Sequence, residues 1–245
     1  MNKKLLVLLI CLAGLCGGIF YLQNNSAVVG SNSTNQEEAG ANQFVGKIDI
    51  KDSPYFKAPD FYNMKSGGSL LLLEKFKTHQ QKSGYTCGPV ACNMVVEYFT
   101  GKLEDEFTMG KIMGTNSKTG TTIKGMVNYF EKIGWQVESS ENSKAPGNFE
   151  DFLKWVDAHL KKGTPIIVEN VDWGGHYRVI IGHDNMGTDF VGDDVLIMAD
   201  PFDTCDHLQD GYVINHAEKF YYMWFDHLLF AKNKQDKPWI IARPK

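Results

Sequence analysis

Hydrophobic and polar residues alternate with two different periodicities along the chain, and these periodicities predict its helices and strands. In the first half of the chain beyond the N-terminal region, apolar side chains recur three or four positions apart, which is the spacing of amphipathic helices. Three such stretches end at or just before a glycine, and they cover residues 87–100, 122–133 and 148–162. Glycine commonly follows a helix C-terminus, so the sequence predicts three helices there.

Beyond Gly163 the pattern changes to short apolar runs separated by turns rich in Gly and Asp. This pattern is typical of strands. Helices that precede a mostly antiparallel sheet predict an α+β fold, in which a helix N-terminus can face a sheet edge. The expected strands are residues 164–171, 176–184, 193–201 and 238–244, with a further strand candidate at 69–78 and a short helix around 217–225.

The N-terminal segment points to export. Lys3 and Lys4 precede an uncharged apolar run from Leu5 to Leu22. Residues 1–27 are therefore either a cleaved signal sequence or an N-terminal membrane anchor, and the length of the run favours the anchor. Two lysines on the N-terminal side place the rest of the chain outside the cytoplasm, in the cell envelope or secreted.

A polar stretch rich in Asn, Ser and Gly follows the apolar run, and this composition is typical of a flexible tether. We assign residues 28–43 to the tether and residues 44–245 to one globular domain. The composition, with 43% hydrophobic and 22% charged residues, supports a full hydrophobic core. A net charge of −4 provides no basic field, so nucleic acid is not an expected partner.

Five cysteines occur in the chain, of which Cys11 and Cys16 belong to the apolar run. Three remain, and an odd number in an oxidising compartment leaves at least one free thiol. Cys92 and Cys205 either pair with each other or are two small buried thiols.

Cys87 is the candidate for a reactive thiol. It stands at the start of the first predicted helix, just before Gly88 and Pro89. Unpaired backbone N–H groups and the helix dipole favour negative charge there, and a nearby histidine would favour it further. A thiolate in such a place is a good nucleophile, whereas a lone cysteine before a helix is otherwise an ordinary structural residue.

A nucleophile needs a base, and His176 is the favoured histidine because it begins a predicted strand after the flexible residues 172–175. His183, at the far end of that strand, is the rival, but its place beside an aspartate in a turn predicts a loop residue. Asp200, which ends an apolar strand before a proline, is the candidate to orient the imidazole; otherwise it is a turn former. Gln81 can reach back across a turn to act as an oxyanion donor with the Cys87 N–H, although neighbouring Gln80 competes for this role.

Four stretches in this order resemble the C39-like peptidase family, which comprises papain-like cysteine peptidases related to the double-glycine leader peptidases of bacteriocin exporters. They are QKSGYTCGPVACNMVVEYFTGK, GTTIKGMVNYFEKIGWQVE, GTPIIVENVDWGGHYRVIIGHD and VLIMADPFD. The resemblance covers about residues 65 to 230. It implies a papain-like cysteine peptidase fold with Cys87 as nucleophile, Gln81 in the oxyanion hole, and His176 and Asp200 completing the site.

We therefore expect an exported or membrane-anchored cysteine peptidase that acts on a peptide or protein, without a cofactor. Export machinery is a possible partner, but the chain lacks the phosphate-binding motif of the transporters to which leader peptidases are usually fused. Two alternatives remain: a catalytically weak binding module with the same fold, and a transamidase or amidase that uses the same Cys/His site. A metal site is disfavoured because no C-x-x-C or H-x-x-x-H spacing occurs.

Overall fold

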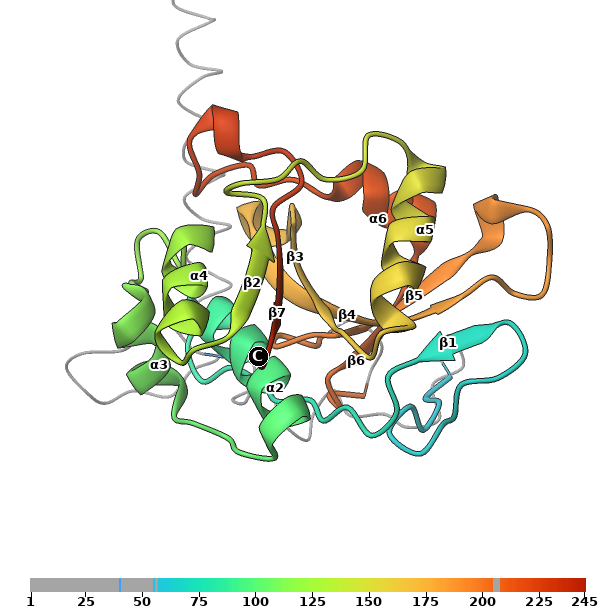
Figure 1. The fold of residues 1–245 in the computed structure, drawn as a ribbon, viewed down its shortest axis with the longest axis horizontal. Helices are drawn as coiled ribbons and strands as arrows, with labels where there is room; N and C mark the ends of the chain where they lie inside the picture. Colours follow the sequence, from blue (N-terminus) through green and yellow to red (C-terminus); the bar gives the residue numbers. More distant parts are fainter. Residues whose placement is uncertain (1–39, 41–54, 56, 205–207) are drawn as a thin grey trace, which may run out of the picture. The chain divides into compact units, whose positions relative to one another are not determined.

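A computed structural model describes residues 40, 55, 57–204 and 208–245 (Figure 1). The predicted N-terminal segment, the predicted tether and Cys205 lie almost wholly or wholly outside these residues. Within them, no helix combines the length and the hydropathy that crossing a membrane requires.

One sheet of seven strands forms the centre of the fold, with the order β2–β7–β3–β4–β5–β6 and β1 paired to β4. Every pairing between these strands is antiparallel. The predicted α+β fold is therefore confirmed. The strands are β1 Leu70–Leu72, β2 Gln136–Ser139, β3 Ile166–Asn170, β4 His176–Asp184, β5 Val195–Ala199, β6 Tyr212–His216 and β7 Trp239–Arg243.

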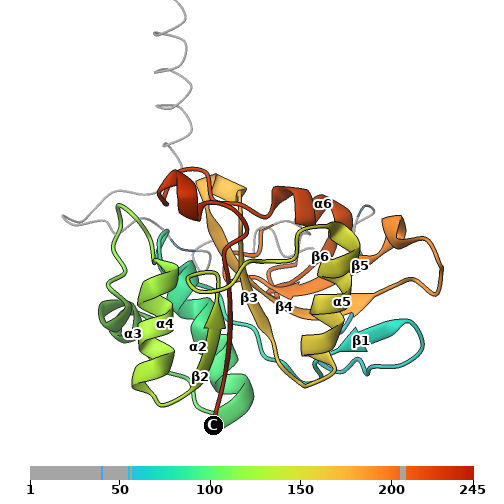
Figure 2. The ribbon, with the colours of Figure 1, turned by 45° about the horizontal axis from the view of Figure 1, so that its top comes forward.

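The helices form two groups, one of α2, α3 and α4 and the other of α5 and α6 (Figures 1 and 2). α2 packs against β4, so the first long helix of the domain lies on the middle of the sheet. The helices are α2 Cys87–Thr100, α3 Glu106–Met113, α4 Ile123–Lys132, α5 Phe149–Leu160 and α6 Ala217–Met223.

Strand β4 positions the site because it lies inside the sheet and pairs with β3, β5 and β1. All its residues except the last are buried, including His176, Arg178 and His183, whose polar groups are bonded to aspartates. A bulge between Ile180 and Gly182 shifts its register against β5. The core around it combines aliphatic residues of the sheet with aromatic side chains from α2, α4 and α5.

Sequence patterns missed α3, β2 and β6, and the prediction of helices followed by a sheet was too simple. β2 lies between α4 and α5 in the sequence, yet it pairs with β7, the last strand of the chain. The strand predicted at 69–78 is only the three residues of β1. Short elements of this kind depend on distant partners for stability, so local periodicity signals them weakly.

His183 corrects a second expectation, because it is a buried strand residue and not a loop residue. Its Nδ1 lies 2.8 Å from Asp157 Oδ1 of α5, and its Nε2 lies 2.9 Å from Asp194 Oδ2. The imidazole thus joins α5 to the segment before β5. Because both of its ring nitrogens contact these aspartates, we assign His183 a structural role.

Candidate active site

Three separate elements bring Cys87, His176 and Asp200 into one region. Cys87 is the first residue of α2, His176 is the first residue of β4, and Asp200 directly follows β5. The register pairs Val179 with Ala199, so Asp200 comes opposite the start of β4. All three side chains are buried.

Asp200 binds two side chains of β4 at once. Its Oδ1 lies 2.7 Å from His176 Nε2, and its Oδ2 accepts a hydrogen bond from Arg178 Nε at 2.6 Å. The two β4 residues are two positions apart, and side chains at this spacing point to the same face of a strand. The backbone N–H of Phe202 also donates to Oδ1, at 2.8 Å. Asp200 therefore fixes the imidazole through Nε2, leaving Nδ1 toward Cys87.

Charge within this group favours ionised side chains despite burial. Burial opposes ionisation of Asp200, but His176 and Arg178 outweigh it and hold the pKa of the carboxyl below its ordinary value. Burial likewise disfavours the imidazolium, yet Asp200 and Cys87 raise the pKa of His176 to about 9. A protonated His176 is thus the stable form at neutral pH.

The Cys87 thiol shows the complementary shift. Burial alone would raise its pKa, but the hydrogen bond from His176 and its charge lower it, with help from the backbone N–H groups of Tyr177 and Gly88. Thr86 makes no side-chain cap to α2, and no acidic residue occupies the first turn. The helix N-terminus therefore keeps its preference for an anion, and the lowered pKa of Cys87 and the raised pKa of His176 both favour a thiolate–imidazolium pair.

Cys92 provides a contrast within the same helix. It is completely buried, and burial followed by the nearby Cys87 raises its pKa well above the ordinary value. Both cysteines are free thiols. The alternative of a small buried thiol therefore describes Cys92, and Cys205 lies outside the described residues.

The structure separates the two neighbouring glutamines. Gln80 bridges the aspartate loop, since its Nε2 donates to Asp200 O at 2.8 Å and its Oε1 accepts from Asp203 N at 3.0 Å. Gln81 instead lines the cavity beside Cys87, and its Nε2 donates to Ser83 O at 2.7 Å. Gln81 is thus the glutamine placed to meet a substrate at the thiol.

A cavity of about 460 Å³ opens at Cys87 and His176. Its walls come from three loops, before α2, before α4 and before β4, together with residues from the chain beyond β5. The described residues that line it are Gln81, Gly84, Tyr85, Cys87, Ser117, Lys118, Gly120, Trp173, Gly175, His176, Phe202 and Leu229.

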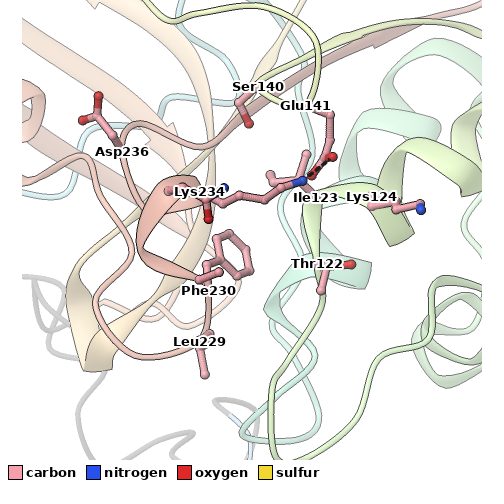
Figure 3. A pocket seen from close by; sticks show the side chains of 11 residues that line it. Thr122, Ile123, Lys124, Ser140, Glu141, Leu229, Phe230, Lys234 and Asp236 are labelled. Carbon is pink, nitrogen blue, oxygen red and sulfur yellow. Dashed lines mark hydrogen bonds and ion pairs between the residues drawn. The ribbon is translucent and has the colours of Figure 1, made fainter.

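A second cavity, of about 430 Å³, is also lined by Leu229 (Figure 3). It lies between the start of α4 and the segment that precedes β7, and Lys234 forms an ion pair with Glu141 across it. Leu229 lines both cavities.

Sequence reasoning missed Arg178 and Phe202. The spacing of two residues from His176 within a strand was a usable signal for Arg178, because it places both side chains on one face. Phe202 carried no such signal, since it stands in a loop whose path depends on the rest of the fold.

Comparison with known families gives one match. Residues 73–225 match the profile of the Peptidase C39 like family. No curated protein sequence matches the chain.

Solved structures with similar folds include three peptidases. The peptidase domain of Streptococcus ComA, a bifunctional ABC transporter in quorum sensing, is 22% identical over 69% of this chain and 99% of its own, with a TM-score of 0.48. A double glycine motif protease from an AMS/PCAT transporter, solved with its leader peptide, is 17% identical over 69% and 91%, with a TM-score of 0.42. Xylellain, a cysteine protease from Xylella fastidiosa, is 12% identical over 87% and 100%, with a TM-score of 0.47. The assignment to a family rests on the profile match, which spans more than half of the chain.

Proposed function

We propose, since the chain belongs to the Peptidase C39 like family and is a cysteine peptidase, that it hydrolyses peptide bonds through Cys87, His176 and Asp200. One observation carries this proposal: a single buried imidazole is hydrogen-bonded to Asp200 and lies beside Cys87, whose pKa it lowers, at the wall of a cavity. Each of these residues begins or directly follows a regular element, so its position is well defined.

The proposed reaction begins with the Cys87 thiolate, which attacks the carbonyl carbon of the substrate. The oxyanion accepts hydrogen bonds from the Cys87 backbone N–H and from Gln81, whose amide keeps one N–H for it while the other donates to Ser83 O. His176 gives its Nδ1 proton to the leaving amine, and a thioester remains. Water then attacks the thioester with His176 as base, and the carboxylate product leaves.

Asp200 and Arg178 support this chemistry without touching the substrate. Asp200 holds the imidazole by Nε2, which keeps Nδ1 toward the sulfur. Arg178 keeps Asp200 ionised, and it also pairs with Asp172 Oδ2 at 2.9 Å. Arg178 thereby connects the catalytic aspartate to the loop before His176.

Export remains part of the proposal, with the N-terminal segment as its support. Lys3, Lys4 and the apolar run Leu5–Leu22 favour a domain held outside the cytoplasm by a membrane anchor. The substrate there would be a peptide or protein, and association with export machinery stays a prediction.

The test is the pH dependence of Cys87 alkylation in the full chain. Iodoacetamide labelling is quantified at Cys87 by tandem mass spectrometry, which distinguishes it from Cys92 in the same tryptic peptide. We expect rapid labelling well below the free-thiol pKa of about 8.5, because the thiolate is already present. His176→Ala should move the labelling midpoint upward by about one pH unit or more.

His216→Ala is the matched control, since His216 is an exposed histidine at the start of α6. It should leave the midpoint unchanged. An ordinary thiol titration in the wild type that His176→Ala does not alter would contradict the mechanism and favour the binding module. A peptide library digested in ¹⁸O water then distinguishes hydrolysis from transamidation. Only hydrolysis places the ¹⁸O label in a new carboxylate, and the Cys87→Ala variant must not incorporate this label.

A further inference from the structure

Trp173 stands in an unusual conformation at the edge of the catalytic cavity. Its backbone has φ 53° and ψ 18°, in the left-handed region that bulky residues rarely adopt. Its side chain is 66% exposed, although Trp is among the residues that gain most from burial. Strained backbone and exposed aromatic surface both cost free energy, and such features concentrate at functional sites.

The indole is nevertheless held in a defined place. Its ring centroid lies 5.1 Å from that of His176 at an interplanar angle of 82°, and 5.1 Å from that of Phe202 at 61°. The loop is fixed at both ends, because Asp172 pairs with Arg178, and Gly174 O accepts hydrogen bonds from the backbone N–H groups of residues 227 and 228. Trp173 is thus a preformed wall of the cavity rather than a loose surface side chain.

The chemistry of His176 decides which part of a substrate meets this wall. The imidazole delivers its proton to the leaving amine, so the amine must lie beside the ring. A group other than Cys87 that contacts the His176 ring therefore borders the substrate residues that depart with that amine. Trp173 is such a group, and Phe202 extends its aromatic surface.

We propose that Trp173, together with Phe202, forms the binding site for the first substrate residue after the cleaved bond and selects an apolar or aromatic side chain there. No carboxylate occurs among the described residues that line the cavity, so nothing in its wall would pair with a cationic side chain. This inference rests on the proposed peptidase function and adds a side-chain preference for the residue that leaves with the amine.

Acyl transfer makes the leaving-side site measurable without a known substrate. The Cys87 thiolate attacks the p-nitrophenyl ester of an N-acylated glycine, forms the thioester and releases p-nitrophenolate. An added amine then attacks the thioester carbonyl, gives its proton to His176 and expels the thiolate as the amide forms. Microscopic reversibility requires this amine to occupy the site from which a leaving amine departs.

The experiment compares phenylalaninamide with glycinamide as the acceptor amine, with the full-length protein. Both carry α-amino groups with similar pKa values of about 8, so their intrinsic reactivities are similar at one pH. The ratio of amide to hydrolysis product is fixed after the thioester forms, so an altered acylation rate cancels. We expect the wild type to prefer phenylalaninamide by about tenfold, which one aromatic contact can supply.

Three variants decide the outcome. Trp173→Ala should reduce the preference to about twofold or less, and Trp173→Phe should restore most of it. Tyr222→Ala removes an equally exposed aromatic side chain from α6, away from the cavity, and should change nothing. A preference that survives Trp173→Ala, even where the overall rate falls, would overturn the inference and leave the peptidase function standing. Absence of any Cys87-dependent p-nitrophenolate release would overturn both.

Discussion

At the scale of one residue, Glu169 places a buried carboxyl behind the active site, and its ionisation affects the stability of the fold. It is completely buried in β3, and within the described part of the chain neither carboxyl oxygen has a hydrogen-bond partner. Burial, then Asp226 and Cys87, raise its pKa well above the ordinary value. A Cβ on Gly175 would lie 2.4 Å from Asp226 Oδ2 and 2.8 Å from Glu169 Oε1, so only glycine fits beside the two carboxyls.

This burial predicts a pH-dependent stability. Because its pKa is raised, Glu169 stays protonated to higher pH in the folded protein than in the unfolded chain, where it ionises above about pH 4.5. Between the two pKa values unfolding releases a proton, so stability falls as pH rises. Glu169→Gln removes this titration. Relative to the variant, the wild type should therefore lose stability between about pH 5 and pH 8, by at most about 1.4 kcal/mol per pH unit.

Urea unfolding at the two pH values measures the difference. Glu138→Gln is the control, because Glu138 is an exposed strand residue of β2. A stability difference between Glu169→Gln and wild type that is constant with pH would show that Glu169 is ionised in the folded state.

Helix α3 shows at the scale of an element how a segment outside the catalytic motifs supports them. Its first residue, Glu106, accepts hydrogen bonds at Oε1 from the backbone N–H of Lys82 at 2.8 Å and from the Thr86 hydroxyl at 2.7 Å. Both partners belong to the loop that carries Gln81 and leads into Cys87. α3 therefore fixes the loop that carries Gln81 and leads into Cys87.

Loss of this contact should affect both stability and reactivity. Glu106→Ala leaves a buried hydroxyl and a backbone N–H without their acceptor, and we expect a loss of about 1–3 kcal/mol in the free energy of unfolding. Cys87 alkylation near neutral pH should slow as well. Glu106→Gln keeps a carbonyl oxygen that can accept both bonds, so it should lie close to the wild type; equal effects of the two variants would show that charge, not hydrogen bonding, is what Glu106 provides.

The position of β7 matters at the scale of the whole molecule. This last strand pairs with β2 on one side and with β3 on the other. All its residues except Arg243 are buried. The end of the described chain thus lies inside the sheet, and β2 is joined to the other strands through it.

Truncation tests this arrangement. A chain that ends at Lys237 lacks β7, leaves the edges of β2 and β3 unpaired, and should show no cooperative thermal transition by circular dichroism. A chain that ends at Arg243 loses only two exposed residues and should melt like the full chain. Cooperative unfolding of the shorter chain would mean that β2 and β3 are stable without the strand between them.

The sequence by itself determined those features that depend on residues close together in the chain. Helical spacing located α2, α4 and α5, and the strand predicted from His176 to Asp184 matched β4 in full. The place of Cys87 at the start of α2 followed from the Gly-Pro pair and the amphipathic run behind it. The roles of Cys87, His176, Asp200 and Gln81 remain predictions, although the structure places all four in one region.

Only the tertiary structure decided what depends on contacts between distant residues. It distinguished Gln81 from Gln80 through the partners of each side chain, buried His183 between two aspartates, and added Arg178 to the aspartate that holds His176. It also set Trp173 against the imidazole. Gln80, Arg178 and His183 make these contacts with residues 11 to 120 positions away, and their sequence neighbours carry no record of that proximity.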